Sequence, residues 1–106
     1  MGAAGMTMKM TLTTQRVLRG LLDSPTNEHY GLEIMKATGL KSGSLYPILG
    51  RLEDAGWIEG RWEEIDETAE GRPRRRLYRL TPDGVVRARA TLEETAHQLG
   101  FDLART

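Results

Sequence analysis

A short basic run carries the most distinctive chemistry of this sequence. Arg72, Arg74 and Arg75 lie beside Gly71 and Pro73, two residue types that favour a turn. A guanidinium group binds phosphate through two parallel hydrogen bonds and also enters the minor groove of DNA. We therefore assign Arg72 and Arg74 to contact with nucleic acid.

The acidic run just before it, residues 63–70, offers the arginines a different partner. If the two runs form the arms of a hairpin, Glu63 lies opposite Arg75 and Glu59 lies opposite Arg79. We assign Arg79 to such an ion pair. Arg75 stays open between pairing and nucleic-acid contact.

A second polar group precedes and begins an apolar periodic segment. It consists of Lys41, Ser42, Ser44 and Tyr46. The first residues of a recognition helix read base edges, and a helix N-terminus favours phosphate. Ser44 and Tyr46 are assigned to DNA contact, and Ser42 to both contact and capping. At Lys41, in the preceding turn, a phosphate contact competes with plain solvation.

No residue pattern predicts catalysis, a metal site or a cofactor. There is no nucleophile with an adjacent base and no paired acid dyad, and the acidic run lacks calcium-loop spacing. His29 and His97 are far apart and lack ligand spacing. The chain has no cysteine, which excludes a disulfide framework and a thiolate metal site. We expect a protein that is not an enzyme.

Three helices must position the polar groups. Thr13 or Thr14 is expected to cap the first helix, which Ser24–Pro25 ends. Asn27 is expected to cap a second helix over 28–38, which Gly39 ends. Apolar residues at helical spacing predict a third helix, closed by Gly56, with Pro47 near its first turn. The stripe consists of Leu45, Ile48, Leu49, Leu52 and Ala55.

After Gly56 the pattern becomes alternating, which predicts two strands. Ile58 and Trp62 are expected to face the core with Tyr78 and Leu80, and residues 66–73 join the strands. Trp57 and Trp62 are interpreted as packing between wing and core. Thr81–Pro82 predicts the start of a last helix.

The predicted order is therefore helix, helix, helix, hairpin and a long helix. The short turn at 39–41 is typical of a helix-turn-helix, and the hairpin after it corresponds to a wing. The fold class is mainly α with a small β-hairpin: a winged helix-turn-helix plus a C-terminal dimerisation helix. We expect a flexible segment at 1–12, the DNA-binding domain at 13–81 and the dimerisation helix at 82–106.

The last helix carries an apolar stripe at seven-residue spacing. A monomer of this size would leave part of this stripe exposed, which indicates a homodimer. The residues expected to form the interface are Val85, Leu92, Ala96, Leu99 and Leu103.

Residues 30–84 resemble the PadR family of transcriptional regulators. The most specific matching segments are Ser42 to Leu49 and Gly71-Arg72-Pro73 in the wing; Tyr30 to Ile34 and Tyr78 to Gly84 match as well. The resemblance implies a winged-helix reader of double-stranded DNA that dimerises through its C-terminal helix and usually represses transcription. In some members a small aromatic or drug-like effector releases the DNA.

Two features depart from the family pattern. Gly50 stands where many relatives have a basic residue or histidine, which removes one possible DNA contact. A single helix follows the wing, so an elaborate effector domain is not expected.

Composition and net charge limit the classes of protein that remain. The 106 residues include 15 basic and 15 acidic side chains, so the formal net charge is zero. No apolar run approaches the roughly 20 residues that span a bilayer, and the first residues lack a secretory signal, so we expect a cytoplasmic protein without membrane contact. Net neutrality and Gly50 support an alternative, a winged-helix protein-interaction module that does not read DNA.

Overall fold

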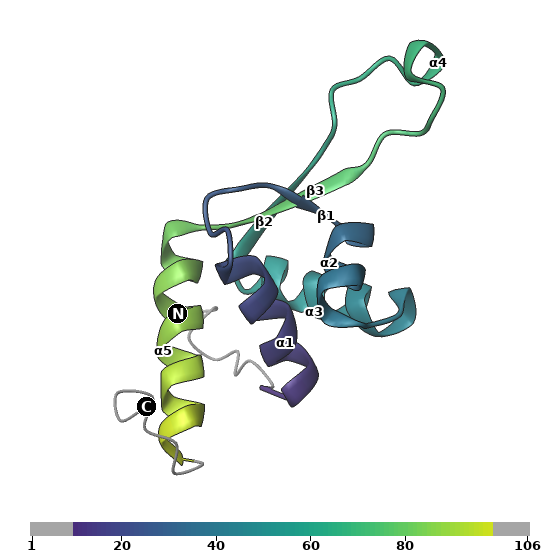
Figure 1. The fold of residues 1–106 in the computed structure, drawn as a ribbon. Helices are drawn as coiled ribbons and strands as arrows, with labels where there is room; N and C mark the ends of the chain where they lie inside the picture. The colour runs from purple at the N-terminus through teal and green to yellow at the C-terminus, as the bar shows by residue number, and fades with distance from the viewer. Residues whose placement is uncertain (1–9, 99–106) are drawn as a thin grey trace.

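The computed structural model describes residues 10–98, and Figure 1 shows how the helices and strands of this part of the chain are arranged. The elements are α1 (Leu12–Leu22), β1 (His29–Tyr30), α2 (Gly31–Thr38), α3 (Ser42–Asp54), β2 (Ile58–Trp62), α4 (Glu67–Glu70), β3 (Arg76–Leu80) and α5 (Pro82–Gln98). The strands form one antiparallel sheet in the order β1-β3-β2. The predicted fold class, a mainly helical winged helix, is confirmed.

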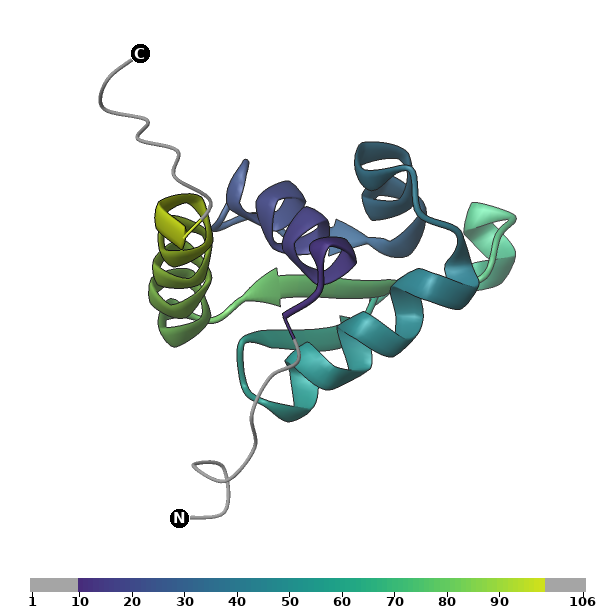
Figure 2. The same ribbon diagram turned by 90° about the horizontal axis from the view of Figure 1, so that it is seen from below.

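Seen from below in Figure 2, α1 lies between α5 and α2, and it also contacts α3. The core fills the space between these helices and the sheet, and its most deeply buried side chains are Val17, Leu18, Leu21, Leu45, Leu49, Leu52, Ile58 and Ala88. The apolar spacing that predicted the third helix is therefore the buried face of α3. Among the described residues no helix is both long and apolar enough to cross a membrane.

Three predicted N-caps were wrong. Thr11, not Thr13 or Thr14, caps α1, and its hydroxyl accepts the backbone N–H of Thr14 at 3.1 Å. Leu12, placed in the segment expected to be flexible, is thus the first helical residue. Ser42 likewise lies inside α3, because Lys41 is its N-cap. Both α1 and α3 begin a little earlier than their best capping residues suggested, because local sequence defines helix ends poorly.

The third wrong cap is Asn27. Residues 29–30 form β1 instead of helix, pairing His29 with Tyr78 and Tyr30 with Leu77. Helix α2 therefore starts at Gly31, and the backbone N–H of Tyr30 donates to the Glu33 carboxylate at 3.1 Å. A two-residue strand held by a distant partner leaves no local periodicity, so the sequence alone could not show it.

Two expectations about helix ends held and one did not. Gly39 ends α2 in the left-handed conformation, with φ of 76°. The Thr81 hydroxyl accepts the Gly84 backbone N–H at 2.9 Å and so caps α5 as predicted. Pro47, however, lies in the second turn of α3, where its missing N–H leaves the Gly43 carbonyl without its helical donor.

The wing extends away from the helical body and ends in the single turn of α4, which the sequence did not predict (Figure 1). Strand register pairs Ile58 with Leu80, Glu59 with Arg79 and Trp62 with Arg76. Trp57 is buried as expected. Trp62 is 58% exposed, so its assignment to the core was wrong: β2 has left the body by that point.

Candidate nucleic-acid interface

The start of α3 presents the first set of predicted contact residues to solvent. Lys41, Ser42 and Ser44 are exposed, and Tyr46 is 44% exposed. The backbone N–H groups of Ser44 and Leu45 both bond to the Lys41 carbonyl at 3.0 Å.

A hollow of about 610 Å³ lies between the helix-turn-helix and the wing. Its walls combine apolar or aromatic side chains with arginines, including Leu32, Tyr46, Trp62, Arg74, Arg75 and Arg76. The structure therefore brings three of the predicted contact residues, one from α3 and two from the wing, to a single concave surface.

The floor of the hollow explains the position of Tyr46. Its hydroxyl lies so close to Gly31, the first residue of α2, that a Cβ atom there would overlap it. Tyr46 is thus packed across the helix-turn-helix on one side and exposed on the other. The glycine determines where the ring is presented.

Arg72 is the wing arginine most firmly held by the protein itself. Its guanidinium donates to both carboxylate oxygens of Glu63, at 2.7 and 3.2 Å. The same carboxylate accepts the Arg75 backbone N–H at 2.9 Å. The hydrogen bond from Arg72 lowers the pKa of Glu63 from 4.5 to about 2. Glu63 therefore fixes the base of the wing tip, and Arg72 is occupied.

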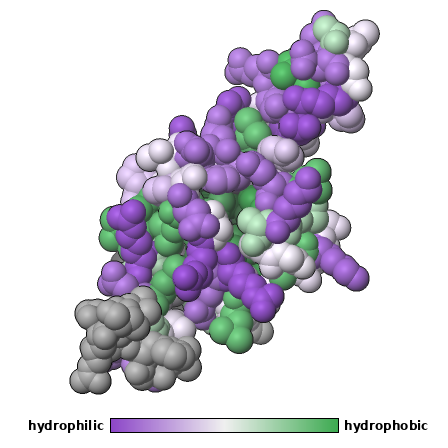
Figure 3. Space-filling view, viewed as in Figure 1, coloured by the Kyte–Doolittle hydropathy of each residue, from purple (hydrophilic) through white to green (hydrophobic). Residues whose placement is uncertain are grey.

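Most other wing arginines are also paired. Arg79 binds Glu59 at 2.8 Å, as predicted, and Arg61 binds Glu28 at 2.6 Å, which lowers the pKa of Glu28. Further pairs join Arg76 to Glu53 at 2.9 Å and, more loosely, Arg74 to Glu67 at 3.9 Å. Space-filling Figure 3 shows the wing as largely hydrophilic. The ion pairs nevertheless neutralise most of its positive charge.

Arg75 differs from its neighbours. Its guanidinium lies over the Tyr30 ring, 4.3 Å from the centroid, and within residues 10–98 it has no carboxylate at ion-pair distance. A stacked guanidinium keeps its N–H donors at the ring edge available for an anion. Arg75 is therefore the wing arginine best prepared to meet phosphate.

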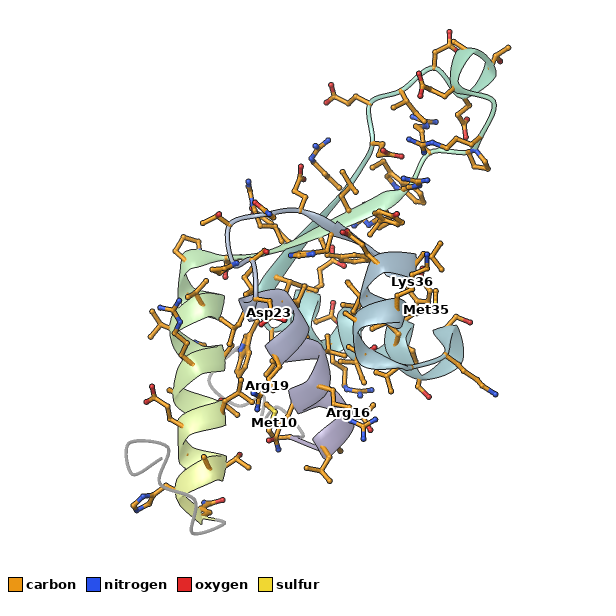
Figure 4. All side chains as sticks on the ribbon, in the orientation of Figure 1. Met10, Arg16, Arg19, Asp23, Met35 and Lys36 are labelled. Carbon is orange, nitrogen blue, oxygen red and sulfur yellow. The ribbon has the colours of Figure 1, made fainter. Side chains whose placement is uncertain are left out.

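Several basic side chains on the helices, unlike most of those on the wing, form no ion pair within the described residues. In the described part of the chain, no ion pair involves Lys41 or Arg51 of the α3 region, or the exposed residues Arg16, Arg19 and Lys36 on α1 and α2 (Figure 4). Sequence reasoning weighed Lys41 but did not consider Arg16, Arg19 and Lys36, because pairing depends on the tertiary structure.

Trp62 and Arg76 are site residues that sequence reasoning missed. The Arg76 guanidinium lies over the Trp62 ring, 5.5 Å from its centroid, while Glu53 of α3 binds the same guanidinium. The alternation of β2 correctly places Trp62 on the same face of the sheet as Ile58. The sequence could not show that the helical body ends before Trp62 and leaves this side chain exposed.

No group of His, Asp and Glu residues suited to a metal ion occurs within residues 10–98. His29 instead bonds through Nε2 to the Ser24 carbonyl oxygen at 3.2 Å. On α5, Val85, Leu92 and Ala96 are half-buried, whereas Leu99 and Leu103 of the predicted stripe lie outside the described residues.

A β2–β3 wing that follows a helix-turn-helix, joined by β1 into a three-stranded sheet, together with polar side chains at the start of α3, defines a winged helix-turn-helix fold. The family model "Transcriptional regulator PadR-like family" matches residues 20–90. The chain belongs to the PadR-like family of transcriptional regulators, as the resemblance implied. No curated protein sequence matches it significantly.

Solved structures share this fold. The chain is similar to smu.1704 from Streptococcus mutans UA159, with 26% identity over 86% of each chain and a TM-score of 0.64. It is also similar to AbfR of Staphylococcus epidermidis, solved in its reduced form bound to DNA, with 26% identity and a TM-score of 0.63. That match covers 79% of this chain and 55% of AbfR, so this chain spans about half of that relative.

Proposed function

We propose that this protein is a sequence-specific DNA-binding repressor that acts as a homodimer on an inverted-repeat operator. Each subunit inserts the start of α3 into the major groove, where Ser42, Ser44 and Tyr46 face the bases and Lys41 meets a phosphate. The wing places Arg74 and Arg75 against the adjacent backbone or minor groove. Arg72 contributes by holding the wing tip through Glu63.

One observation carries the proposal: Tyr46 of α3 and Arg74 and Arg75 of the wing line the same concave surface. A duplex lying against this surface would meet the recognition helix and the wing together. Membership of the PadR-like family and the DNA-bound structure of AbfR are consistent with this function.

The dimer is proposed from the surface of α5. Gly84 and Ala88 face the core of the same subunit, while Val86 is 66% exposed. Half-buried Val85, Leu92 and Ala96 lie between these two faces. A second α5 would cover the outer side of this stripe, and two-fold symmetry would then place two recognition helices about one turn of DNA apart.

A second candidate is a winged-helix module that binds protein and does not read DNA. The ion pairs of five wing arginines favour it, because they reduce the positive charge that DNA binding requires. Release by a small aromatic effector, which the family resemblance implies, is supported by no contact of the described residues and stays an expectation.

The deciding experiment is to select DNA duplexes from a random pool by their binding to the full-length protein. The selected duplexes are then footprinted at two salt concentrations. We expect an enriched inverted repeat with half-sites about one helical turn apart, bound less tightly at higher salt. A pool that yields no enriched sequence would reject DNA reading and favour the interaction module. An enriched site without symmetry would reject the dimeric arrangement.

A further inference from the structure

Large exposed apolar side chains are concentrated in the hollow between the helix-turn-helix and the wing. Among the described residues, five large hydrophobic side chains are exposed, and three of them, Leu32, Tyr46 and Trp62, line this hollow. Scattered exposed apolar residues need no explanation, whereas a cluster in a concave surface marks an interaction site.

Strand register shows that Trp62 faces this site and is not a misplaced core residue. Side chains of a strand alternate between faces, so Ile58, Gly60 and Trp62 share the face that covers the helices. Ile58 is 2% exposed and Trp62 is 58% exposed on that same face. The indole therefore lies exposed at the junction of the helical body and the wing.

Arg76 and Glu53 hold the indole in this position. The Arg76 guanidinium stacks on Trp62 and simultaneously donates to Glu53 of α3 at 2.9 Å. This arrangement links the recognition helix, β3 and β2 through side chains. A preorganised ring loses little conformational freedom when a partner covers it.

The charge of the hollow identifies the partner. Arg74, Arg75 and Arg76 surround the apolar groups, and the guanidinium of Arg75 has no carboxylate partner within residues 10–98. A surface that alternates arginine with aromatic rings suits a strand that alternates phosphate with sugar. The hollow is also continuous with Tyr46 at the start of α3.

We infer that the hollow seats one sugar–phosphate strand of the DNA, with Trp62 packed on deoxyribose and Arg75 bound to the neighbouring phosphate. This inference rests on the proposed DNA-binding function, adds the contact of Trp62 to it and assigns Arg75 to the phosphate beside that contact. Trp62 then supports affinity through apolar contact, and Arg75 supports it through counterion release.

The two contacts have different signatures in a salt titration with the enriched duplex. Trp62→Ala should weaken binding roughly tenfold and leave the slope of log K against log salt unchanged. Arg75→Gln should reduce the magnitude of that slope by about 0.9. Arg79→Gln is the matched control, because Arg79 lies on the opposite face of the sheet and is paired with Glu59.

Tryptophan fluorescence provides a direct readout, because Trp57 is buried and Trp62 is exposed. Iodide should quench Trp62 in the free protein, and the enriched duplex should protect it; Trp62→Phe should remove this response. Unchanged quenching with DNA bound, or full affinity of Trp62→Ala, would overturn the inference while leaving the proposed function intact. Protection that rises with protein concentration alone would assign the hollow to a second copy of the chain and also overturn it.

Discussion

Glu63 and Arg72 form a two-point ion pair at the base of the wing tip, with nitrogen–oxygen distances of 2.7 and 3.2 Å. Glu63 also exchanges backbone contacts with Arg75: its carboxylate accepts the Arg75 N–H, and its own N–H donates to the Arg75 carbonyl at 2.9 Å. One acidic residue thus closes the loop that carries the basic run. The acidic and basic runs, which the sequence analysis placed on the two arms of a hairpin, thus bind each other.

Acid should loosen the wing tip. The pKa of Glu63 is lowered from 4.5 to about 2 in the folded protein, so its contribution to stability is complete above pH 4.5 and is lost as the pH falls toward 2. We expect the backbone N–H of Arg75 to lose exchange protection over this range. In Glu63→Ala, which removes the acceptor, the same protection should be low at neutral pH and nearly independent of pH. Glu64→Ala, a neighbour in the acidic run, is the control and should behave as wild type.

Arg72 and Arg74 should differ in their salt dependence. Arg72→Gln is expected to weaken operator binding by loosening the wing, with little change in salt slope, because its guanidinium is occupied by Glu63. Arg74→Gln should reduce the slope by about 0.9, the value for one lost phosphate contact. Equal reductions for both variants would assign Arg72 to phosphate as well.

Gly31 and Tyr46 should be coupled in DNA binding. Gly31→Ala places a methyl group where the Tyr46 hydroxyl lies and so displaces the ring, at a cost in stability of about 1 kcal/mol. Operator affinity should fall as much as it does in Tyr46→Ala, and the double variant should show no further loss. Gly20→Ala, whose new methyl group has ordinary contact distances, is the control. Additive losses would show that the two residues act independently.

Gly84 should be the most sensitive position of α5. A Cβ atom there would collide with the backbone of Trp57, which cannot move aside as a side chain can. We expect Gly84→Ala to destabilise the domain by about 3 kcal/mol in denaturant unfolding. Gly50→Ala, in open space on α3, should be neutral or stabilising by up to about 1 kcal/mol. A tolerated Gly84→Ala would mean that α5 is not packed closely on Trp57.

A charge in the α5 stripe should prevent dimer formation. Leu92→Asp places a carboxylate in the surface proposed to meet the second subunit, where its desolvation is unfavourable. Sedimentation velocity should show a dimer for the wild type and a monomer for Leu92→Asp, with operator binding lost in parallel. Ala90→Asp adds the same charge on the opposite, exposed side of α5 and should remain dimeric. A monomeric wild type that binds its operator tightly would remove the dimer from the mechanism.

The sequence by itself determined the order of the four longer helices and the two long strands. Leu45, Ile48, Leu49 and Leu52 recur at helical spacing, and Ile58 begins the change to strand alternation, so local periodicity was sufficient. It also identified the exposed start of α3, because those residues lie outside the apolar stripe. The cross-strand pair of Glu59 and Arg79 followed from the assumed register alone.

Only the tertiary structure decided which charges and rings are free. Five of the six wing arginines have carboxylate partners, two of them, Glu28 and Glu53, outside the hairpin. Trp62 belongs by pattern to a buried face, yet it is exposed because the body ends before it. Pairing and burial depend on residues that are distant along the chain, whereas helices and strands follow from neighbours.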